Sequence, residues 1–389
     1  MPTDSKSIHM IERLIGFDTT SRNSNLELME FVGGYLKDLG VESELVHNED
    51  GSKANLYATL GPTDRPGIAL SGHTDVVPVD GQDWHTDPFQ VVEKDARLYG
   101  RGTCDMKSFI GVCLALAPEF LARDIVTPLH FAFSHDEEIG CVGVRSLIAS
   151  LVARPIKPSA VIIGEPTEMK VVRAHKGKLS YCCHVRGFEA HSSLSHIGVN
   201  AVEAAAEAVA YLKSMARRHR DEGPFDPELV PPYTTVHTGT IHGGTALNIV
   251  PRDCHFEFEF RHLPDDDPDA LLSELRRHIA EHIEPEMHAA QPATGFDFEP
   301  LSHIPGLSTD EDADIVQLAK ALTGQNTTAK VSFGTEAGLF HDGGMPAVVC
   351  GPGSIDQAHK PDEFIAREQI NQCEAFLRKL FERCWQGTV

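Results

Sequence analysis

Histidine and acidic residues recur in five short segments of this 389-residue chain, and each segment lies at or just beyond an apolar stretch or a glycine-rich turn. The residues are His73, Asp105, Glu137, Glu138, Glu165 and His359. Imidazoles together with carboxylates are a ligand set that suits Zn²⁺, with Co²⁺ or Mn²⁺ as substitutes. The residue types therefore predict a metal centre, provided that the fold brings these distant segments together.

The number of candidate ligands matches a pair of divalent ions that share one carboxylate. The set divides into a bridging Asp105, His73 with Glu165 on one ion, and Glu138 with His359 on the other. Glu137 is then left over, and a carboxylate beside a metal-activated water is a natural general base. The chemistry predicted from this pattern is hydrolysis with Glu137 as the proton acceptor.

Each component also has an ordinary interpretation. Adjacent glutamates usually lie in solvent, Gly-Glu-Pro is often a turn, and Asp105 precedes a helical segment that it could cap. Asp75 stands two residues after His73, on the same side of an extended chain, where it could accept the second ring N–H of His73. The joint occurrence of all these residues at the ends of apolar segments favours the metal site.

The elements that must position these residues alternate between strands and helices. Strands are expected at 54–60, 67–72, 129–133, 160–163 and 347–350, and helices at 106–121, 315–322 and 366–385. This alternation predicts an α/β fold with a mixed, mostly parallel sheet flanked by helices. Sites in such folds lie at the carboxyl ends of the strands, where the candidate ligands stand.

The pattern changes near residue 179. Segment 253–261 alternates strictly, with Cys254, Phe256, Phe258 and Phe260 on one face, as in an antiparallel sheet with one wet face. Asn200 with Glu203 forms a capping-box pattern before a long helix, and Ser308 with Glu311 suggests a second one. We predict a catalytic domain over 1–178, an inserted α+β domain over 179–300, and a return to the catalytic domain over 301–389.

Composition limits the class of protein. A chain of this length usually forms more than one core. The balance of 34 basic against 57 acidic residues gives a net charge of −23, which argues against nucleic acid or an anionic membrane as partner. No apolar run reaches a membrane-spanning length, and residues 1–15 lack the order of a signal peptide. Nine cysteines without a Cys-x-x-Cys spacing suit reduced thiols, so we expect a cytoplasmic protein.

Five motifs, SGHTDVVP, GRGTCDMKS, SHDEEIG, IIGEPTE and AHKPDE, resemble in order those of the dinuclear-zinc deacylases and peptidases. This family includes acetylornithine deacetylases, succinyl-diaminopimelate desuccinylases, aminoacylases and carboxypeptidase G-type enzymes. The resemblance spans nearly the whole chain and implies two Zn²⁺ ions, the ligand roles given above, Glu137 as base and Asp75 as the residue that orients His73. In one departure, Ser108 stands where the family usually has glycine.

The resemblance also implies that the inserted domain is a lid through which two subunits form a homodimer. His191, in GFEAHSS, matches a lid histidine that in relatives reaches the neighbouring subunit's active site and would stabilise the oxyanion. Asn248 and Arg252 resemble substrate-binding lid residues, Arg252 with a planar fork for a carboxylate. Thr335 and Gly338 lie in a turn that lines the substrate site in the family.

Within the family, GRGTCDMK, DEEIGCVG and FGTEAGLF are more similar to the acetylornithine deacetylase branch than to the desuccinylases. The implied reaction removes the acetyl group from N2-acetyl-L-ornithine, a step of arginine biosynthesis. Glu336 could receive a cationic side chain of the substrate, or could be an ordinary acid at a helix start. A related N-acyl-amino-acid hydrolase (desuccinylase, aminoacylase or dipeptidase) is the alternative, and a non-catalytic metal-binding scaffold is a third.

Overall fold

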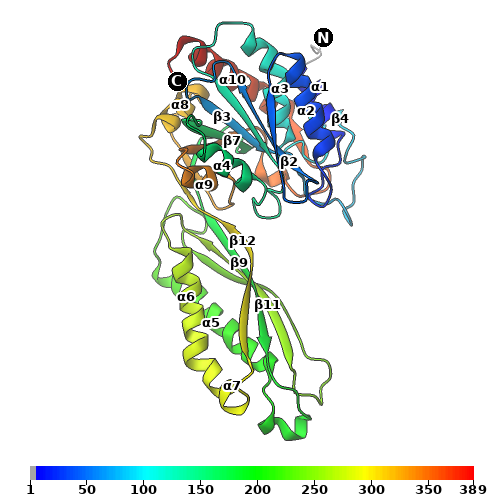
Figure 1. Cartoon of the computed structure of the whole chain (residues 1–389), viewed down its shortest axis with the longest axis vertical. Coiled ribbons are helices and arrows are strands. Elements are labelled where there is room, and N and C mark those ends of the chain that lie inside the picture. The colour runs from blue at the N-terminus through cyan, green and yellow to red at the C-terminus, as the bar shows by residue number, and fades with distance from the viewer. Residues whose placement is uncertain (1–5) are drawn as a thin grey trace. The chain divides into compact units, whose positions relative to one another are not determined.

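The computed structural model describes residues 6–389, which form two compact units (Figure 1). The first unit contains the chain up to residue 174 together with 307–330 and 335–389, and the second contains His175–Gly306 with Val331–Gly334. Residues 1–5, the start of the segment in which no signal peptide is expected, lie outside the described residues. Across residues 6–389, no helix has the length and apolar character needed to cross a membrane.

The first unit is built on a mixed sheet whose central strands are parallel. Its strands within residues 6–389 are β1 (Ser43–His47), β2 (Ala54–Leu60), β3 (Ile68–His73), β6 (Leu129–Ser134), β7 (Ala160–Pro166), β8 (Val172–His175), β13 (Leu307–Ser308), β14 (Ala329–Val331) and β15 (Ala347–Gly351). Their order is β1-β2-β6-β3-β7-β15-β8-β13, with β14 beside β8. The pairs β6–β3, β3–β7 and β7–β15 are parallel. The α/β fold predicted from the sequence is confirmed.

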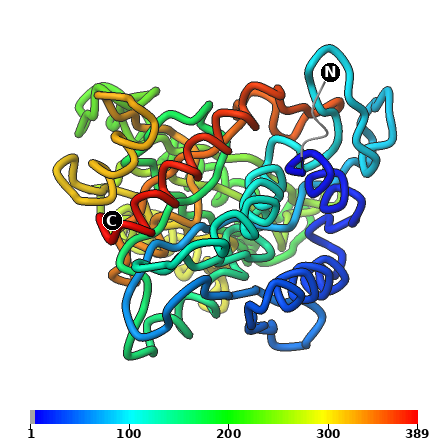
Figure 2. Tube along the Cα trace, turned by 90° about the horizontal axis from the view of Figure 1, so that it is seen from above, coloured from blue at the N-terminus to red at the C-terminus, as the bar shows by residue number. Residues whose placement is uncertain are grey.

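Helices cover both faces of this sheet. They are α1 (Lys6–Ile15), α2 (Leu26–Asp38), α3 (Lys107–Leu121), α4 (Val144–Val152), α8 (Asp314–Thr323), α9 (Ala337–Asp342) and α10 (Arg367–Gln386). Helices α1, α2, α3, α8 and α10 share one apolar core with the sheet, whereas α4 and α9 pack on its other face. Figure 2 shows the C-terminal helix α10 beside α3, so the end of the chain completes the core that its first half begins.

Three short strands form a small second sheet in the same unit. They are β4 (Val92–Lys94), β5 (Arg97–Tyr99) and β16 (Phe364–Ala366), in the order β16-β5-β4. This sheet was not predicted, because its strands are too short to show a period. It joins the segment that follows His359 to the loop that precedes Asp105.

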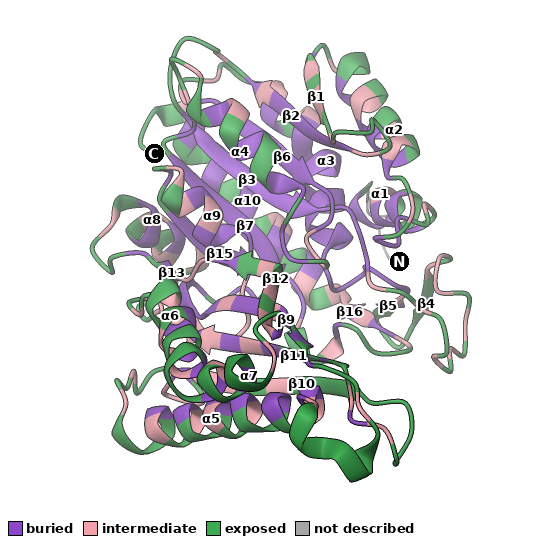
Figure 3. Ribbon diagram, turned by 60° about the horizontal axis from the view of Figure 1, so that its bottom comes forward, coloured by how far each residue is buried: buried purple, intermediate pink, exposed green. Residues whose placement is uncertain are grey.

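The second unit is an antiparallel sheet with helices on one face. Its elements are β9 (Gly177–Arg186), α5 (Ala201–Glu222), β10 (Thr235–Gly243), β11 (Asp253–His262), α6 (Pro268–His278), α7 (Glu284–Ala290) and β12 (Gly295–Ile304), with strand order β10-β11-β9-β12. Figure 3 shows the alternation of buried and exposed residues along these elements. In β11, the side chains of Cys254, Phe256, Phe258 and Phe260 are buried under the helices, as the sequence predicted. The predicted cap at Asn200 is also present, since its side chain accepts the N–H groups of Val202 and Glu203.

The second predicted capping box is wrong. Ser308 lies in strand β13, and α8 begins after Ala313 without a side-chain cap. The backbone N–H of Thr309 donates to the carbonyl of Arg173, and the Thr309 hydroxyl donates to that of Ala347. Pairing with the sheet therefore keeps this segment extended, and tertiary hydrogen bonds override the local helix signal.

Candidate active site

The candidate ligands of the first unit meet at one edge of the parallel sheet. His73 is the last residue of β3, Glu165 stands near the end of β7, and Glu137 with Glu138 follows the end of β6. Because β3 is parallel to both β6 and β7, and His73 pairs with Ser134 in register, these strand ends are neighbours. The register of the sheet thus brings together residues that are far apart in the sequence.

Asp105 lies between the two histidines. Its Oδ1 is 3.0 Å from Nε2 of His73, and its Oδ2 is 3.3 Å from Nε2 of His359. His73 Nε2 also lies 3.5 Å from Glu165 Oε1, and His359 Nε2 lies 3.0 Å from Glu138 Oε2. One oxygen of Asp105 therefore points to each His–carboxylate pair, which is the arrangement that a bridging ligand between two cations requires.

The electrostatics of this cluster fit divalent cations. Burial raises the pKa of Glu137 to about 8 and that of Glu138 to about 7, and neighbouring acids act in the same direction. Burial and the charge of Asp105 likewise raise the pKa of Glu165 well above its ordinary value. Cations among these oxygens would favour the charged carboxylates and offset their mutual repulsion. The donor set is also the one that Zn²⁺ accepts.

The two histidines are held differently. Burial alone would lower the pKa of His73, but Glu165, Asp105 and Asp75 together raise it well above its ordinary value. Hydrogen bonds to Asp105 and Glu138 raise the pKa of His359 to about 10. The His73 side chain is buried, whereas that of His359 is 55% exposed. His359 therefore lies on the side of the cluster that solvent and a substrate can reach.

Asp75 connects the strand of His73 to the glutamate pair. The ring Nδ1 of His73 donates to the backbone carbonyl of Asp75 at 2.9 Å, and the Asp75 carboxylate lies 3.5 Å away. That carboxylate accepts the Ser21 hydroxyl and the backbone N–H groups of Glu137 and Glu138. The main contact to the histidine is thus made by a different atom of Asp75 from the one expected, and the carboxylate positions the turn that carries Glu137.

The loop that carries Asp105 is anchored by Glu363. Glu363 Oε1 accepts the backbone N–H groups of Gly102, Cys104 and Asp105, at 3.1, 2.8 and 3.0 Å. Its Oε2 pairs with Nη1 of Arg101 at 2.7 Å, and both side chains are fully buried. Asp105 does not cap α3, whose first residue is Lys107 and whose N-cap position is Met106. Its carboxylate is therefore available to the histidines.

The long loop after Asp75 supports His359. The amide of Gln82 donates to the backbone carbonyl of His359 at 3.1 Å, and its oxygen accepts from Arg101 and Trp84. Arg101 also stacks over the Trp84 ring, 5.1 Å from its centroid. These contacts tie the loop to the backbone that carries His359.

Glu137 is held by its own turn. The Cys141 thiol lies 3.2 Å from Glu137 Oε1 as a hydrogen-bond donor, and the backbone N–H of Cys141 donates to the Glu137 carbonyl at 2.8 Å. Cys141 is buried, and burial raises the pKa of its thiol well above the ordinary value. The thiol therefore remains protonated and orients Oε1, and Oε2 does not share this contact.

Glu336, Thr335 and Gly338 lie at the start of α9 and are all buried. The Glu336 carboxylate accepts the hydroxyls of Ser71 and Ser134, and its backbone carbonyl accepts N–H groups of α9. Burial raises the pKa of Glu336 to about 7. These contacts fit a helix-start acid that ties α9 to β3 and β6.

The three lid residues predicted from the sequence lie in the second unit, in two paired loops. His191 is bridged to Ile249, and the N–H of Ser192 donates to the carbonyl of Asn248. His191 is exposed, and its Nδ1 is hydrogen-bonded to the Ser193 hydroxyl. Arg252 is also exposed. Its Nε donates to the Asp253 carboxylate at 2.9 Å, so one of its guanidinium donors already has a partner.

Sequence reasoning missed the supporting residues Glu363, Arg101, Gln82 and Cys141. Glu363 and Arg101 lie within the quoted motifs AHKPDE and GRGTCDMKS, so the motifs marked the positions without revealing the contacts. Gln82 and Cys141 carried no signal of their own, because their roles depend on hydrogen-bond partners that only the folded chain brings into place.

Comparison with known proteins shows which family the chain resembles. Residues 69–383 match the model of peptidase family M20/M25/M40. An acetylornithine deacetylase of Pasteurella multocida is 35% identical over 94% of this chain and 92% of its own length, and one of Myxococcus xanthus is 34% identical over 95% of each.

Solved structures share the fold. An M20 family metallo-carboxypeptidase of Sulfolobus solfataricus superposes with a TM-score of 0.75 at 18% identity, over 98% of this chain and 99% of that one. A Bacillus subtilis protein described as a dinuclear metal binding peptidase of the M20 family gives a TM-score of 0.65 at 14% identity, over 98% of both chains. The family match and the level of identity agree, and the chain belongs to peptidase family M20/M25/M40.

Proposed function

We propose that this amide-bond hydrolase removes the acetyl group from N2-acetyl-L-ornithine and releases L-ornithine and acetate. The observation that carries the proposal is the convergence of two His–carboxylate pairs on Asp105, namely His73 with Glu165 and His359 with Glu138. Glu137 lies beside His73 and Glu165. The choice of substrate rests on relatives named acetylornithine deacetylase that align over nearly the whole chain. We propose further that this reaction serves arginine biosynthesis.

Two Zn²⁺ ions, or Co²⁺ or Mn²⁺, would be held by His73 with Glu165 and by Glu138 with His359, and Asp105 would bridge them. When bound, these ions polarise the amide carbonyl and acidify water. The protein's own contribution is to hold the ligands through Asp75 and Glu363, so that their positions are fixed before substrate arrives.

Glu137 is proposed to move the proton. Its carboxylate takes a proton from the attacking water and passes the same proton to the departing amine nitrogen. The Cys141 thiol donates a hydrogen bond to Oε1, so Oε2 is the oxygen that carries the proton in this scheme. The turn held by Asp75 keeps the carboxylate in place while it changes protonation state.

We extend the proposal to a homodimer formed through the second unit. In that assembly His191 would donate a hydrogen bond from Nε2 to the oxyanion that develops in the partner's active site. Asn248 and Arg252 would bind the substrate carboxylate, and Thr335 and Gly338 would line the substrate site. The support is the exposed position of His191 and its pairing loop. Glu336 would act by holding α9 in place beside the substrate site. The nine buried, unpaired cysteines suit the reducing cytoplasm in which we place the enzyme.

The test is a substrate panel with and without metal. Purified protein is stripped with a chelator, assayed, and assayed again after Zn²⁺ is returned. The panel contains N2-acetyl-L-ornithine, N-succinyl-diaminopimelate, an N-acetyl hydrophobic amino acid and a dipeptide.

The expected result is release of acetate from acetylornithine with the highest kcat/KM, lost on stripping and restored by Zn²⁺. A preference for another member of the panel would replace the proposed substrate by that of a desuccinylase, aminoacylase or dipeptidase. Metal binding without turnover of any amide would instead support the scaffold alternative.

A further inference from the structure

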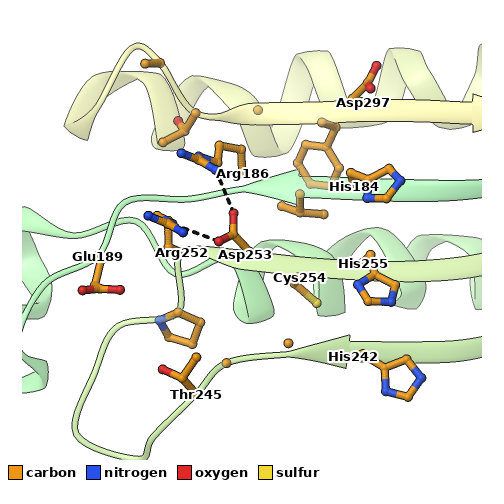
Figure 4. A pocket seen from close by; sticks show the side chains of 18 of the residues that line it. His184, Arg186, Glu189, His242, Thr245, Arg252, Asp253, Cys254, His255 and Asp297 are labelled. Atoms are coloured by element: carbon orange, nitrogen blue, oxygen red, sulfur yellow. Dashed lines mark hydrogen bonds and ion pairs between the residues drawn. The ribbon is translucent and has the colours of Figure 1, made fainter.

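A row of three histidines crosses the open face of the sheet in the second unit. His242 on β10, His255 on β11 and His184 on β9 occupy matched positions, since His255 pairs in register with both of the others. All three are exposed and line a depression of about 820 Å³. Figure 4 shows them on three neighbouring strands, one after another across the sheet.

Their separation suits binding to one ion. The ring centroids of His242 and His255 are 5.4 Å apart, and those of His184 and His255 are 6.0 Å apart. With metal–nitrogen bonds of about 2.0–2.1 Å and tetrahedral angles, two imidazoles on one zinc ion have centroids roughly 5 Å apart. The central ring is therefore close to this separation from each neighbour. His184 and His242 stand on either side of it, and both exposed side chains would have to turn toward His255 for all three to reach one ion.

The surrounding groups favour a bound cation. The Nε2 of His184 lies 3.1 Å from Glu299 Oε2, so a proton shared there leaves Nδ1 of His184 with a lone pair for a metal. The next row across the same face carries Glu257 and Glu299, which face each other across Cys182. Two carboxylates beside three imidazoles give this part of the face a negative potential when the histidines are neutral.

We propose that His184, His242 and His255 form a binding site for a borderline divalent cation such as Zn²⁺ or Ni²⁺. The site is built from residues other than those of the candidate active site and does not depend on the proposed reaction. Imidazole nitrogens select such ions over Mg²⁺ and Ca²⁺, which prefer oxygen ligands. A bound ion would link β10, an edge strand of the sheet, to β11 and β9.

The test compares two single substitutions in the full chain. His255→Gln removes the central ligand. His237→Gln is the matched control, because His237 is an exposed histidine on β10, the strand that carries His242, and it pairs with Glu259 instead of a histidine. Circular dichroism checks that both variants fold, which their exposed positions favour.

Each metal-free protein is given two equivalents of Zn²⁺, enough for the candidate active site, and is then titrated with NiCl₂ by calorimetry. Its retention on an immobilised Ni²⁺ column is also measured. The wild type and His237→Gln should bind one more Ni²⁺ per chain than His255→Gln and should need more imidazole for elution. Equal stoichiometry and equal elution of all three proteins would overturn the proposal. Separate His184→Gln and His242→Gln variants should each weaken the extra binding, and no weakening in either would also contradict the three-ligand site.

Discussion

Replacing Glu363 by glutamine should destabilise the first unit and loosen its metal centre at the same time. The carboxylate accepts three backbone N–H groups, including that of Asp105, and pairs with Arg101 in a fully buried contact. A glutamine can still offer an oxygen to the backbone, but its amide N–H₂ then faces the guanidinium. The substitution therefore leaves a buried cation without its counter-charge.

The size of the effect follows from this arrangement. Removing one partner of a buried ion pair costs about 3–5 kcal/mol, a large part of the roughly 5–15 kcal/mol that stabilises a typical protein. By comparison, Arg22 and Asp80 form an ion pair with side chains 54% and 64% exposed. Asp80→Asn is the matched control, and it should cost less than about 1 kcal/mol.

The assay is urea unfolding of the metal-free protein at pH 7, followed by tryptophan fluorescence. Both tryptophans, Trp84 and Trp385, belong to the first unit, so the signal reports that unit alone. Zn²⁺ affinity is then measured by competition with a chelating dye. Supporting residues of this kind typically change metal affinity by about 10–100-fold, so Glu363→Gln should weaken binding by that order.

The reasoning would be refuted if Glu363→Gln lost less than about 1 kcal/mol, as an exposed pair does, and bound Zn²⁺ like the wild type. A double variant that also carries Arg101→Met should recover part of the lost stability, because the uncompensated charge is then absent. Failure of that recovery would assign the loss to the backbone contacts and not to the ion pair.

Three further predictions concern catalysis and pH. Glu137→Gln should retain both metal equivalents, measured by atomic absorption, while kcat falls by at least about 100-fold; activity near the wild-type level would remove Glu137 from the base role. His191→Ala should lower kcat by roughly 100-fold or more without altering metal content, and an unchanged rate would exclude it from oxyanion stabilisation. His130 is buried beside Tyr57 and Thr59, and burial lowers its pKa from 6.5 to about 4. The fold favours neutral His130, so the contribution of this residue to stability is complete above pH 6.5 and declines by up to about 3 kcal/mol as pH falls toward 4. His130→Gln should therefore show a flatter pH dependence of the urea-unfolding free energy over that range than the exposed control His47→Gln. Parallel curves for the two variants would contradict this account.

The convergence of the candidate ligands could be predicted from the sequence because it depends on a simple property of parallel strands. His73 ends β3 and Glu165 stands near the end of β7, and strands that run in the same direction deliver their ends to one edge. Apolar runs followed by acids or histidines are visible without coordinates. The fold class followed from the same alternation of strands and helices.

The supporting contacts could not be predicted in this way. Glu363 and Asp105 are 258 residues apart in the chain. Their contact joins a side chain to backbone N–H groups, and backbone groups are the same for almost every residue type, so the sequence does not mark them. The failed cap at Ser308 has a related cause, since pairing with the sheet competes with a local helix signal and prevails. Local patterns report what a segment prefers, whereas these features depend on what surrounds it.

Asp75 and Glu363 raise the question of why further carboxylates are buried close to anionic ligands. Each accepts backbone N–H groups of residues that carry or adjoin those ligands, Glu137 in one case and Asp105 in the other. Backbone N–H groups offer only partial positive charge, so they do not neutralise the acids that they hold in place. Arg101 offsets the charge of Glu363, and the buried Lys107 interacts electrostatically with Asp75. The candidate ligand carboxylates themselves are in contact with the two histidines. Two divalent cations among the candidate ligands would balance more of this negative charge than one, so the anchoring acids favour the proposed dinuclear centre over a single ion.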